Sequence, residues 1–377
     1  MNIVKKIYEL IFFSFCNIFF SKRINYITDN AGWVICDVGN NLKRNIKESN
    51  LNITITAFGL RNSIVHFGTI GAFIGKNELN LPHKSNKVIV TWFHVLPNEK
   101  RFGLVKEAVK YVDIWHTSSE LTKNKMISLG VPKDKIFVIP LGIDLDYFNN
   151  RDQMKSKEAL GIPKDKIVIG YFQKDGNGWK EGNSPKLIKG PDIFCNVVTR
   201  LSKKYDIFIL LTGPARGYIK NYLLKENIDF IHTYLDDPNK VASYYKASDL
   251  YLITSREEGG PKSILESMAC GVPLVSSKVG MAEDIILDGI NGFLVDVEDI
   301  DSLYNKASSL IENKDLRLKI IKNGLDTVKS YSWKKISKQY FNKIYMNNKI
   351  NSTRHIKWLF QRKKSRNFGD KIPIPNN

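Results

Sequence analysis

Residues 254–273 read TSREEGGPKSILESMACGVP and contain the pattern from which the fold is interpreted. The apolar run 250–254 leads into this stretch and is typical of a buried strand. Gly259 and Gly260 allow the backbone to approach a ligand closely, and Pro261 suits the first position of a helix. A strand, a glycine loop and a helix N-terminus in this order predict an anion-binding site, because free N–H groups and the helix dipole point at the ligand.

Two carboxylates flank this predicted site. Glu258 lies in the loop, and Glu266 lies slightly more than one turn into the helix. A carboxylate can accept two hydroxyl groups at once, which suits the diols of ribose or a hexose. The apolar neighbours of Glu266 place it near the buried side of the helix, which favours a functional role over a solvated one. Neither glutamate is paired with an adjacent base in the sequence, and Glu257 is interpreted as a neighbour outside the site that tolerates Ala or Gln.

Strand-like and helix-like segments alternate on both sides of this stretch. In the second half of the chain we expect helices at 191–203 and 239–245 and strands at 167–171, 207–212, 230–232 and 250–254. In the first half we expect strands at 24–27, 53–58, 63–67 and 87–92. Alternating strands and helices predict parallel sheets that bind ligands at the carboxyl ends of their strands. With 377 residues, the chain has room for two such α/β domains.

Two similar connectors suggest where the domains divide. GVPKDKI at 130–136 and GIPKDKI at 161–167 each follow a helix and lead into a strand, so the second copy marks a restart. The polar residues 141–160 are interpreted as the interdomain linker. The expected units are an apolar and basic segment 1–22, a first domain 23–163, a second domain 164–332, a helix 333–350 that crosses back to the first domain, and a basic tail 351–377.

The composition limits the partners and the compartment. Lys and Arg exceed Asp and Glu by 57 to 38, which favours anionic ligands, although a bias toward Lys, Asn and Ile explains the charge equally well. No nucleic-acid partner is predicted, because no basic patch with interleaved aromatic residues is present. The four cysteines are scattered, which argues against a disulfide frame or a zinc site and favours a reducing, cytoplasmic compartment. No Asp-x-Asp motif follows a strand, so no metal is expected.

The N-terminal segment has two interpretations that the sequence leaves open. Residues 10–20 are largely apolar and are flanked by Lys5, Lys6, Lys22 and Arg23. This run is shorter than the ~20 residues that a spanning helix needs. It is either a helix lying in the interface of an anionic membrane, as a peripheral attachment, or a buried first helix of the domain.

The motif as a whole resembles a known family. The Glu-x7-Glu spacing of Glu258 and Glu266, followed by ACGVPLV at 269–275, is similar to the retaining nucleotide-sugar glycosyltransferases of the GT-B fold (family 4-like). Further similar pieces are VIPLGID at 138–144, KGPD at 189–192 and DGINGFLV at 288–295. The resemblance implies two Rossmann-like domains facing a central cleft. It also implies transfer of a sugar, with retention of anomeric configuration, to a glycan or lipid-linked acceptor in polysaccharide biosynthesis. The nucleoside diphosphate sugar would be a co-substrate, and no cofactor is implied.

The resemblance also assigns roles to residues. The first domain would bind the acceptor and the second the donor, with Glu266 on the donor ribose, Glu258 on the transferred sugar and Lys189 on the diphosphate. The implied catalytic residues are His94, Glu258 and Lys189. The implied donor-binding residues are Gln173, Lys174, Lys189, Glu258, Gly259, Gly260, Pro261, Lys262 and Glu266. The implied acceptor-side residues are Gly32, Trp33 and His94.

The chain departs from the family pattern after the first strand of the second domain. Where the family usually has an Arg, this chain has Gln173 and Lys174, followed by a polar insert to Lys186. Lys174 would supply a point charge without the bidentate fork of Arg. For His94 a structural role is the alternative, and His66 is expected to be structural. Three other functions stay open: a nucleotide-sugar epimerase, a phosphorylase on the same fold, and a non-catalytic nucleotide-sugar-binding protein.

Overall fold

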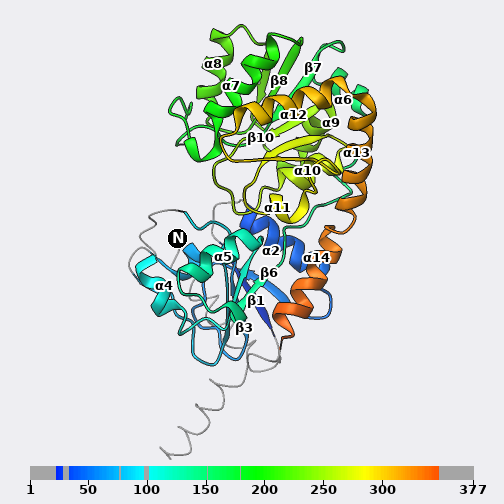
Figure 1. Ribbon diagram of the computed structural model, residues 1–377. Coiled ribbons are helices and arrows are strands. Elements are labelled where there is room, and N and C mark those ends of the chain that lie inside the picture. Colours follow the sequence, from blue (N-terminus) through cyan, green and yellow to red (C-terminus); the bar gives the residue numbers. More distant parts are fainter. Residues whose placement is uncertain are drawn as a thin grey trace, which may run out of the picture.

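The computed structural model describes residues 23–28, 34–75, 78–96, 102–150, 152–178 and 180–347. It contains two α/β domains, one above the other in Figure 1, each built on a six-stranded sheet. The strand order is β2-β1-β3-β4-β5-β6 in the first sheet and β12-β11-β10-β7-β8-β9 in the second. All the paired strands are parallel. The predicted pair of Rossmann-like domains is confirmed.

The first domain carries short buried strands. They are β1 (Ile24–Ile27), β2 (Leu51–Thr54), β3 (Ile64–Phe67), β4 (Lys87–Thr91), β5 (Ile114–Thr117) and β6 (Ile136–Val138). The helices are α2 (Val34–Asn45), α3 (Ile70–Phe73), α4 (Phe102–Ala108), α5 (Glu120–Ser128) and the 3-10 turn η1 (Lys133–Lys135). The strand predicted at 53–58 is β2 in the structure. β2 begins two residues earlier and ends four residues earlier than predicted. Its register with β1 pairs Leu51 with Ile24 and stops at Thr54, opposite Ile27.

The second domain is closer to the prediction. Its strands are β7 (Ile167–Tyr171), β8 (Ile207–Thr212), β9 (Phe230–Thr233), β10 (Leu250–Ile253), β11 (Leu274–Ser277) and β12 (Phe293–Val295). Its longer helices are α6 (Gln153–Ala159), α7 (Pro191–Ser202), α8 (Gly217–Lys225), α9 (Val241–Ala247), α10 (Ser263–Ala269), α12 (Ile300–Glu312) and α13 (Lys314–Val328). Short turns are η2 (Leu187–Lys189), η3 (Pro238–Lys240) and α11 (Ala282–Ile285). β8 has the predicted bounds because every one of its residues is buried, which gives a continuous apolar run.

The polar stretch between the domains is not a bare linker. It contains α6, which packs against α9 of the second domain. Lys157 on this helix is buried, and its Nζ donates to Asp249 Oδ2 at 2.7 Å. Asp249 Oδ2 also accepts from the backbone N of Val168 at the start of β7. Residues 153–159 are therefore fastened to the second sheet.

The chain returns to the first domain at its C-terminal end. Helix α14 (Trp333–Tyr340) and the π-helical turn η4 (Phe341–Tyr345), orange in Figure 1, lie against that domain, and α14 packs on α2. A Cβ at Gly142 would lie 2.4 Å from the Trp333 ring, so only glycine fits there. Lys87 Nζ donates to Ile344 O at 3.1 Å and to Asn347 O at 2.9 Å. The crossing segment is thus held by packing and by charge-assisted hydrogen bonds.

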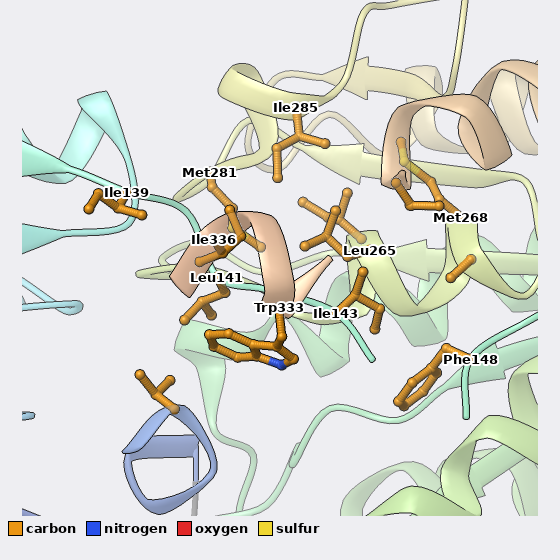
Figure 2. Close-up of a cluster of buried hydrophobic side chains, with 14 of the residues drawn as sticks. Ile139, Leu141, Ile143, Phe148, Leu265, Met268, Met281, Ile285, Trp333 and Ile336 are labelled. Carbon is orange, nitrogen blue, oxygen red and sulfur yellow. The ribbon is translucent and has the colours of Figure 1, made fainter. Parts of the chain in front are cut away.

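One apolar cluster joins both domains to the crossing helix. Figure 2 shows Trp333 close to Leu141 and Ile143, which come from the segment between the domains. The same cluster includes Leu265 on α10 and Met281 before α11 in the second domain. Burial of this surface stabilises the two domains as one unit, since apolar area removed from water contributes roughly 25 cal/mol per Å².

A buried polar network fastens the crossing segment to the first sheet. His66 Nδ1 lies 2.8 Å from Tyr345 Oη, and its Nε2 lies 2.8 Å from Thr91 Oγ1. His116 Nδ1 lies 2.9 Å from the same Thr91 oxygen, and its Nε2 lies 3.1 Å from Ile139 O. Burial, together with His116, holds the pKa of His66 well below its usual value, and burial lowers the pKa of His116 to about 4. The structural role expected for His66 is confirmed.

None of the helices within the described ranges has the length and apolar character that crossing a bilayer requires. The predictions for residues 1–22 concern a segment outside the described residues.

The two buried histidines predict a loss of stability in mild acid. Below pH 6.5 the unfolded chain takes up protons, whereas folded His116 stays neutral until about pH 4. The free energy of unfolding therefore decreases as the pH falls, by about 1.4 kcal/mol per pH unit for each such histidine. Urea unfolding between pH 7.5 and 4.5 should show this slope, and His116→Asn should make it shallower. Equal slopes in the two proteins would contradict the assignment.

Candidate functional site

A buried carboxylate lies at the carboxyl end of β10, in the middle of the second sheet. The Glu258 side chain is 8% exposed, and Lys189 Nζ donates to its Oε1 at 2.6 Å. Ser255 Oγ lies 2.9 Å from the same oxygen, and His94 Nε2 lies 3.5 Å from Oε2. The cation that pairs with Glu258 lies 69 positions away in the sequence, so folding and not a neighbouring residue brings it to the carboxylate.

Two opposing effects set the charge of Glu258. Burial alone would raise the pKa of this carboxyl group, but the charges and hydrogen bonds of Lys189 and His94 lower it to about 2. The group is therefore a carboxylate at neutral pH. It can accept hydrogen bonds from hydroxyl groups, but it has no proton to donate as a general acid.

A tight turn between η2 and α7 brings Lys189 to this carboxylate. Gly190 ends the turn at φ 62°, in the left-handed region that favours glycine. A Cβ at Gly190 would lie 1.9 Å from Thr254 O, and Thr254 Oγ1 donates to Gly190 O at 2.8 Å. Tyr171 Oη donates to Lys189 O at 2.8 Å. The KGPD motif and the end of β10 are therefore in direct contact because residue 190 has no side chain.

Arg256 fastens the same two segments, and sequence reasoning missed it. Its Nη1 and Nη2 donate to the two carboxylate oxygens of Asp192 at 2.8 and 2.7 Å. Nη1 also donates to Leu187 O at 2.7 Å, and the backbone N of Arg256 donates to Ile188 O. A bidentate pair of this kind fixes orientation as well as distance. Asp192 and Arg256 lie far apart in the sequence, so no local pattern could have identified the pair.

The loop of Glu258 also touches the first domain. Ser118 Oγ donates to Gly259 O at 2.9 Å. A Cβ at Gly259 would lie 2.2 Å from Phe93 O, and one at Gly260 would lie 2.7 Å from Ser118 Oγ. The domain contact itself thus requires both glycines, and their predicted contact with a donor stays a prediction.

His94 faces Glu258 from the opposite domain. Its ring is 35% exposed, and Trp92 Nε1 donates to its backbone O at 2.6 Å, which fixes the chain just beyond β4. His94 thus approaches Glu258 to 3.5 Å across the boundary between the domains, and its catalytic role stays a prediction. Gly32 and Trp33, which were predicted on the same side, lie outside the described residues.

The second motif glutamate lies in a separate charged group. Tyr245 Oη donates to Glu266 Oε2 at 3.0 Å, and Lys262 Nζ lies 3.8 Å from Oε1. Burial raises the pKa of Glu266, and Lys262 only partly offsets this. Lys262 Nζ donates to Asp37 Oδ2 at 2.7 Å. Burial lowers the pKa of Lys262, but Glu266 and Asp37 outweigh it and raise that pKa overall. Lys262 is thus a charged link to α2 of the first domain.

Helix α10 begins later than predicted. The sequence predicts Pro261 at the first helical position, but the helix begins at Ser263 with Lys262 as its N-cap. The first hydrogen bond, from Ile264 N to Pro261 O, spans three residues and closes a 3-10 type turn. The α-helical pattern starts only with the bond from Glu266 N to Lys262 O. The prediction for Pro261 is wrong by two residues, and Glu266 lies in the first turn.

The residues after β7 reach the same site. Ser255 Oγ lies 2.6 Å from Gln173 Oε1, so Gln173 and Glu258 contact one hydroxyl group. Lys174 is half-buried, and its charge acts on Lys186. Lys186 was not among the predicted site residues. The only signal for it in the sequence is its place at the end of the polar insert, just before KGPD.

Glu257 has a role that the sequence did not indicate. Its carboxylate forms an ion pair with Lys125 on α5 of the first domain. Nearby, Asp284 Oδ2 accepts from the backbone N of Glu120 at 3.0 Å. No local pattern indicates this ion pair, because it forms only when the loop that carries Glu257 lies against the other domain.

In the described part of the chain, cavities adjoin the first sheet and the contact between the domains. One, of about 750 Å³, lies beyond the carboxyl ends of β1 and β3, and its lining includes Phe58, Arg61, Leu81 and His83. Another, of about 210 Å³, is lined by residues of both domains, among them Asp37, Asp144, Asn239 and Lys262. In the part of the chain that the structure describes, no three His, Cys, Asp or Glu side chains gather in a metal-binding group.

The second domain matches a known family in sequence. Residues 185–327 match the family described as glycosyl transferases group 1. A protein of Methanocaldococcus jannaschii named as an uncharacterized glycosyltransferase is 31% identical over 150 residues, which are 39% of this chain and 42% of that protein. N-acetyl-alpha-D-glucosaminyl L-malate synthase of Bacillus anthracis is 24% identical over 248 residues, 63% of this chain and 61% of that protein. The chain thus spans less than two thirds of either relative.

The fold of most of the chain is similar to a solved structure. The crystal structure of Anabaena Alr3699/HepE in complex with UDP and glucose superposes with a TM-score of 0.71 at 15% identity. The superposition covers 86% of this chain and 99% of that chain. The two-domain arrangement is the GT-B fold.

The domain contact at Gly259 leads to a testable prediction. In Gly259→Ala the new Cβ meets backbone of the other domain, which cannot rotate away, so the variant should lose about 1–3 kcal/mol of stability. X-ray scattering should report a larger radius of gyration. The matched control is Gly103→Ala in α4, where no heavy atom lies within 4 Å of the added group. Equal melting temperatures and radii for the two variants would show that the domains do not meet in this way.

Proposed function

We propose that this chain is a glycosyltransferase that moves a sugar, a hexose, from a nucleoside diphosphate sugar to a glycan or lipid-linked acceptor. The observation that carries the proposal is the Lys189–Glu258 pair at the carboxyl end of β10, facing His94 of the other domain. This pair lies within the segment that matches glycosyl transferases group 1. A fixed cation and a fixed carboxylate beside a domain boundary suit a ligand that carries both phosphate and hydroxyl groups.

The donor lies on the second domain in this proposal. Lys189 contacts the diphosphate, and Glu258 accepts hydrogen bonds from hydroxyl groups of the sugar being transferred. The low pKa of Glu258 supports this role, because the carboxylate stays charged at any physiological pH. Glu266 accepts hydrogen bonds from the donor ribose, and Lys262 stands next to it. Gln173, Lys174, Gly259, Gly260 and Pro261 complete the donor side.

The acceptor binds on the first domain in this proposal, with His94 nearest the reacting carbon and Gly32 and Trp33 on the same side. The bond between the anomeric carbon and the diphosphate oxygen breaks. The acceptor oxygen bonds to that carbon on the same face, and its proton passes to the departing phosphate oxygen. The lysines stabilise the charge that develops on the leaving group, which is the role a metal has elsewhere. We therefore propose a reaction with retention and without an essential metal.

A panel of nucleoside diphosphate sugars tests the function. Thermal shift identifies a donor, since a ligand that binds only the folded state raises its stability. The identified donor is then incubated with and without acceptors and with EDTA, and products are analysed by NMR for anomeric configuration. Transfer that needs an acceptor and survives EDTA supports the proposal. Epimerised donor without acceptor indicates an epimerase, phosphate-dependent cleavage a phosphorylase, and binding without turnover a sugar-nucleotide sensor.

The two motif glutamates should affect different kinetic constants. Glu266→Gln removes contacts that are alike in the ground and transition states, so mainly the KM for the donor should rise. Glu258→Gln removes a charge beside the sugar whose bond breaks, so kcat should fall more than KM rises. Steady-state kinetics with the identified donor measures both. If both folded variants keep wild-type kinetics, the site assignment is wrong.

We also propose that the protein works in the cytoplasm, peripherally attached to an anionic membrane surface by residues 1–22. The apolar run and the lysines around it support this, because amphipathic segments with basic flanks bind such interfaces. Full-length protein should float with anionic liposomes, and protein without residues 1–22 should float several-fold less. Equal flotation of both would contradict the attachment.

A further inference from the structure

Lys262 lies between two carboxylates that belong to different domains. Its Nζ donates to Asp37 Oδ2 of the first domain at 2.7 Å and lies 3.8 Å from Glu266 Oε1 of the second. Lys262 has helical backbone angles, and Glu266 N donates to Lys262 O at 3.0 Å, so the two side chains are neighbours one turn apart on α10. The ammonium group is thus within reach of both carboxylates, and it is bonded to the one across the domain boundary.

Asp37 is held in place by its own helix. Asn41 Nδ2, one turn further along α2, donates to Asp37 Oδ1 at 2.8 Å and to Asp37 O at 2.9 Å. Asn41 is buried, and α2 packs against the crossing helix α14. One oxygen of the Asp37 carboxylate is therefore occupied within the first domain, and the other, Oδ2, binds Lys262.

The pairing with Asp37 leaves one oxygen of Glu266 open. Tyr245 Oη donates to Glu266 Oε2 at 3.0 Å. Among the residues that the structure describes, none places a donor within hydrogen-bond distance of Oε1, and Lys262 Nζ stays 3.8 Å away. An open carboxylate oxygen can accept hydrogen bonds from hydroxyl groups of a ligand. A lysine that moved onto Oε1 would take the place that such a hydroxyl group needs.

Lys262 has both the charge and the room to change its partner. Burial lowers the pKa of Lys262, but Glu266 and Asp37 raise it overall, so the ammonium group is charged at neutral pH and needs a carboxylate. The cavity of about 210 Å³ between the domains is lined by both Lys262 and Asp37. A side chain beside a cavity can move without repacking a core. The lysine can therefore turn from Asp37 to Glu266 when the two domains separate.

We propose that Asp37 is a positioning residue of the donor site, which holds Lys262 away from Glu266 and keeps Oε1 open for the hydroxyl groups of the donor ribose. This role rests on the proposed function, in which Glu266 binds that ribose, and deepens it. While the domains are in contact, Asp37 binds Lys262 and the nucleotide binds tightly. When they separate, Lys262 pairs with Glu266 and displaces the ribose, which favours release of the nucleoside diphosphate after transfer. Nucleotide binding and domain contact therefore stabilise each other.

Calorimetric titration of the full chain with nucleoside diphosphates tests the role of Asp37. The probes are UDP, GDP and ADP, each compared with its 2′,3′-dideoxy form, which lacks the ribose hydroxyl groups. The carboxamide of Asp37→Asn cannot hold Lys262, so affinity for the ribonucleotide that binds wild type should fall about tenfold, as for a lost hydrogen bond to a charged group. The dideoxy form has no hydroxyl group to offer Glu266, so its affinity should be the same in both proteins.

Two further comparisons separate positioning from stability. In the Lys262→Met background no lysine is present to pair with Glu266, so adding Asp37→Asn should cause no further loss of affinity. Arg44→Gln is the matched control, because Arg44 lies on the same helix and beside the same cavity but pairs with Asp144. This control should bind the nucleotide as wild type does, and melting temperatures check that each variant is folded.

Three results would overturn the role of Asp37. They are equal affinities of wild type and Asp37→Asn, a full loss from Asp37→Asn in the Lys262→Met background, and an equal loss for the ribonucleotide and its dideoxy form. A loss in Arg44→Gln as large as in Asp37→Asn would likewise show a general effect of the domain contact. If wild type binds none of these nucleotides, the proposed function itself is wrong, whereas the other results leave it standing.

Discussion

The burial of one charge, that of Glu258, is the constraint on which the site depends. A carboxylate that is 8% exposed is stable only with close partners, and breaking a buried pair typically costs about 3–5 kcal/mol. Two of its partners, Lys189 and His94, come from distant parts of the chain, and the third, Ser255, lies three residues away. Two contacts bring Lys189 to this carboxylate: the close approach of Gly190 to Thr254 and the bidentate hydrogen bonds of Arg256 to Asp192.

The same loop is also where the two domains meet. Gly259 lies against Phe93, Glu257 pairs with Lys125, and Lys262 reaches Asp37. Each of these contacts crosses from the second domain to the first, on either side of Glu258. The loop that carries the candidate site is thus the loop that sets the distance between the domains. A change in domain position would alter the approach of His94 to Glu258, which couples the geometry of the site to the arrangement of the domains.

The crossing helix limits how far that arrangement can change. Trp333 packs on Gly142 in a core shared by both domains, and His66 fixes Tyr345 to the first sheet. The insert after β7 has an equally firm base in the Asp175–Arg216 pair. The candidate site therefore lies between two parts of the structure that are each held by fully buried contacts. Such support keeps charged side chains in position before a ligand binds, which reduces the ordering cost of binding.

The sequence by itself determined the fold class. Alternating apolar runs predicted the parallel sheets, because this signal is local and repeats with a fixed period. The roles of Glu258, Glu266 and Lys189 were implied only by the resemblance of short local motifs to a family, and they stay predictions. Tertiary structure alone decided which charges pair. Arg256 and Asp192, Arg216 and Asp175, and Glu257 and Lys125 are separated by 41 to 132 positions. No local pattern links residues at such separations, so their contacts exist only once the sheets have formed and the two domains have packed together.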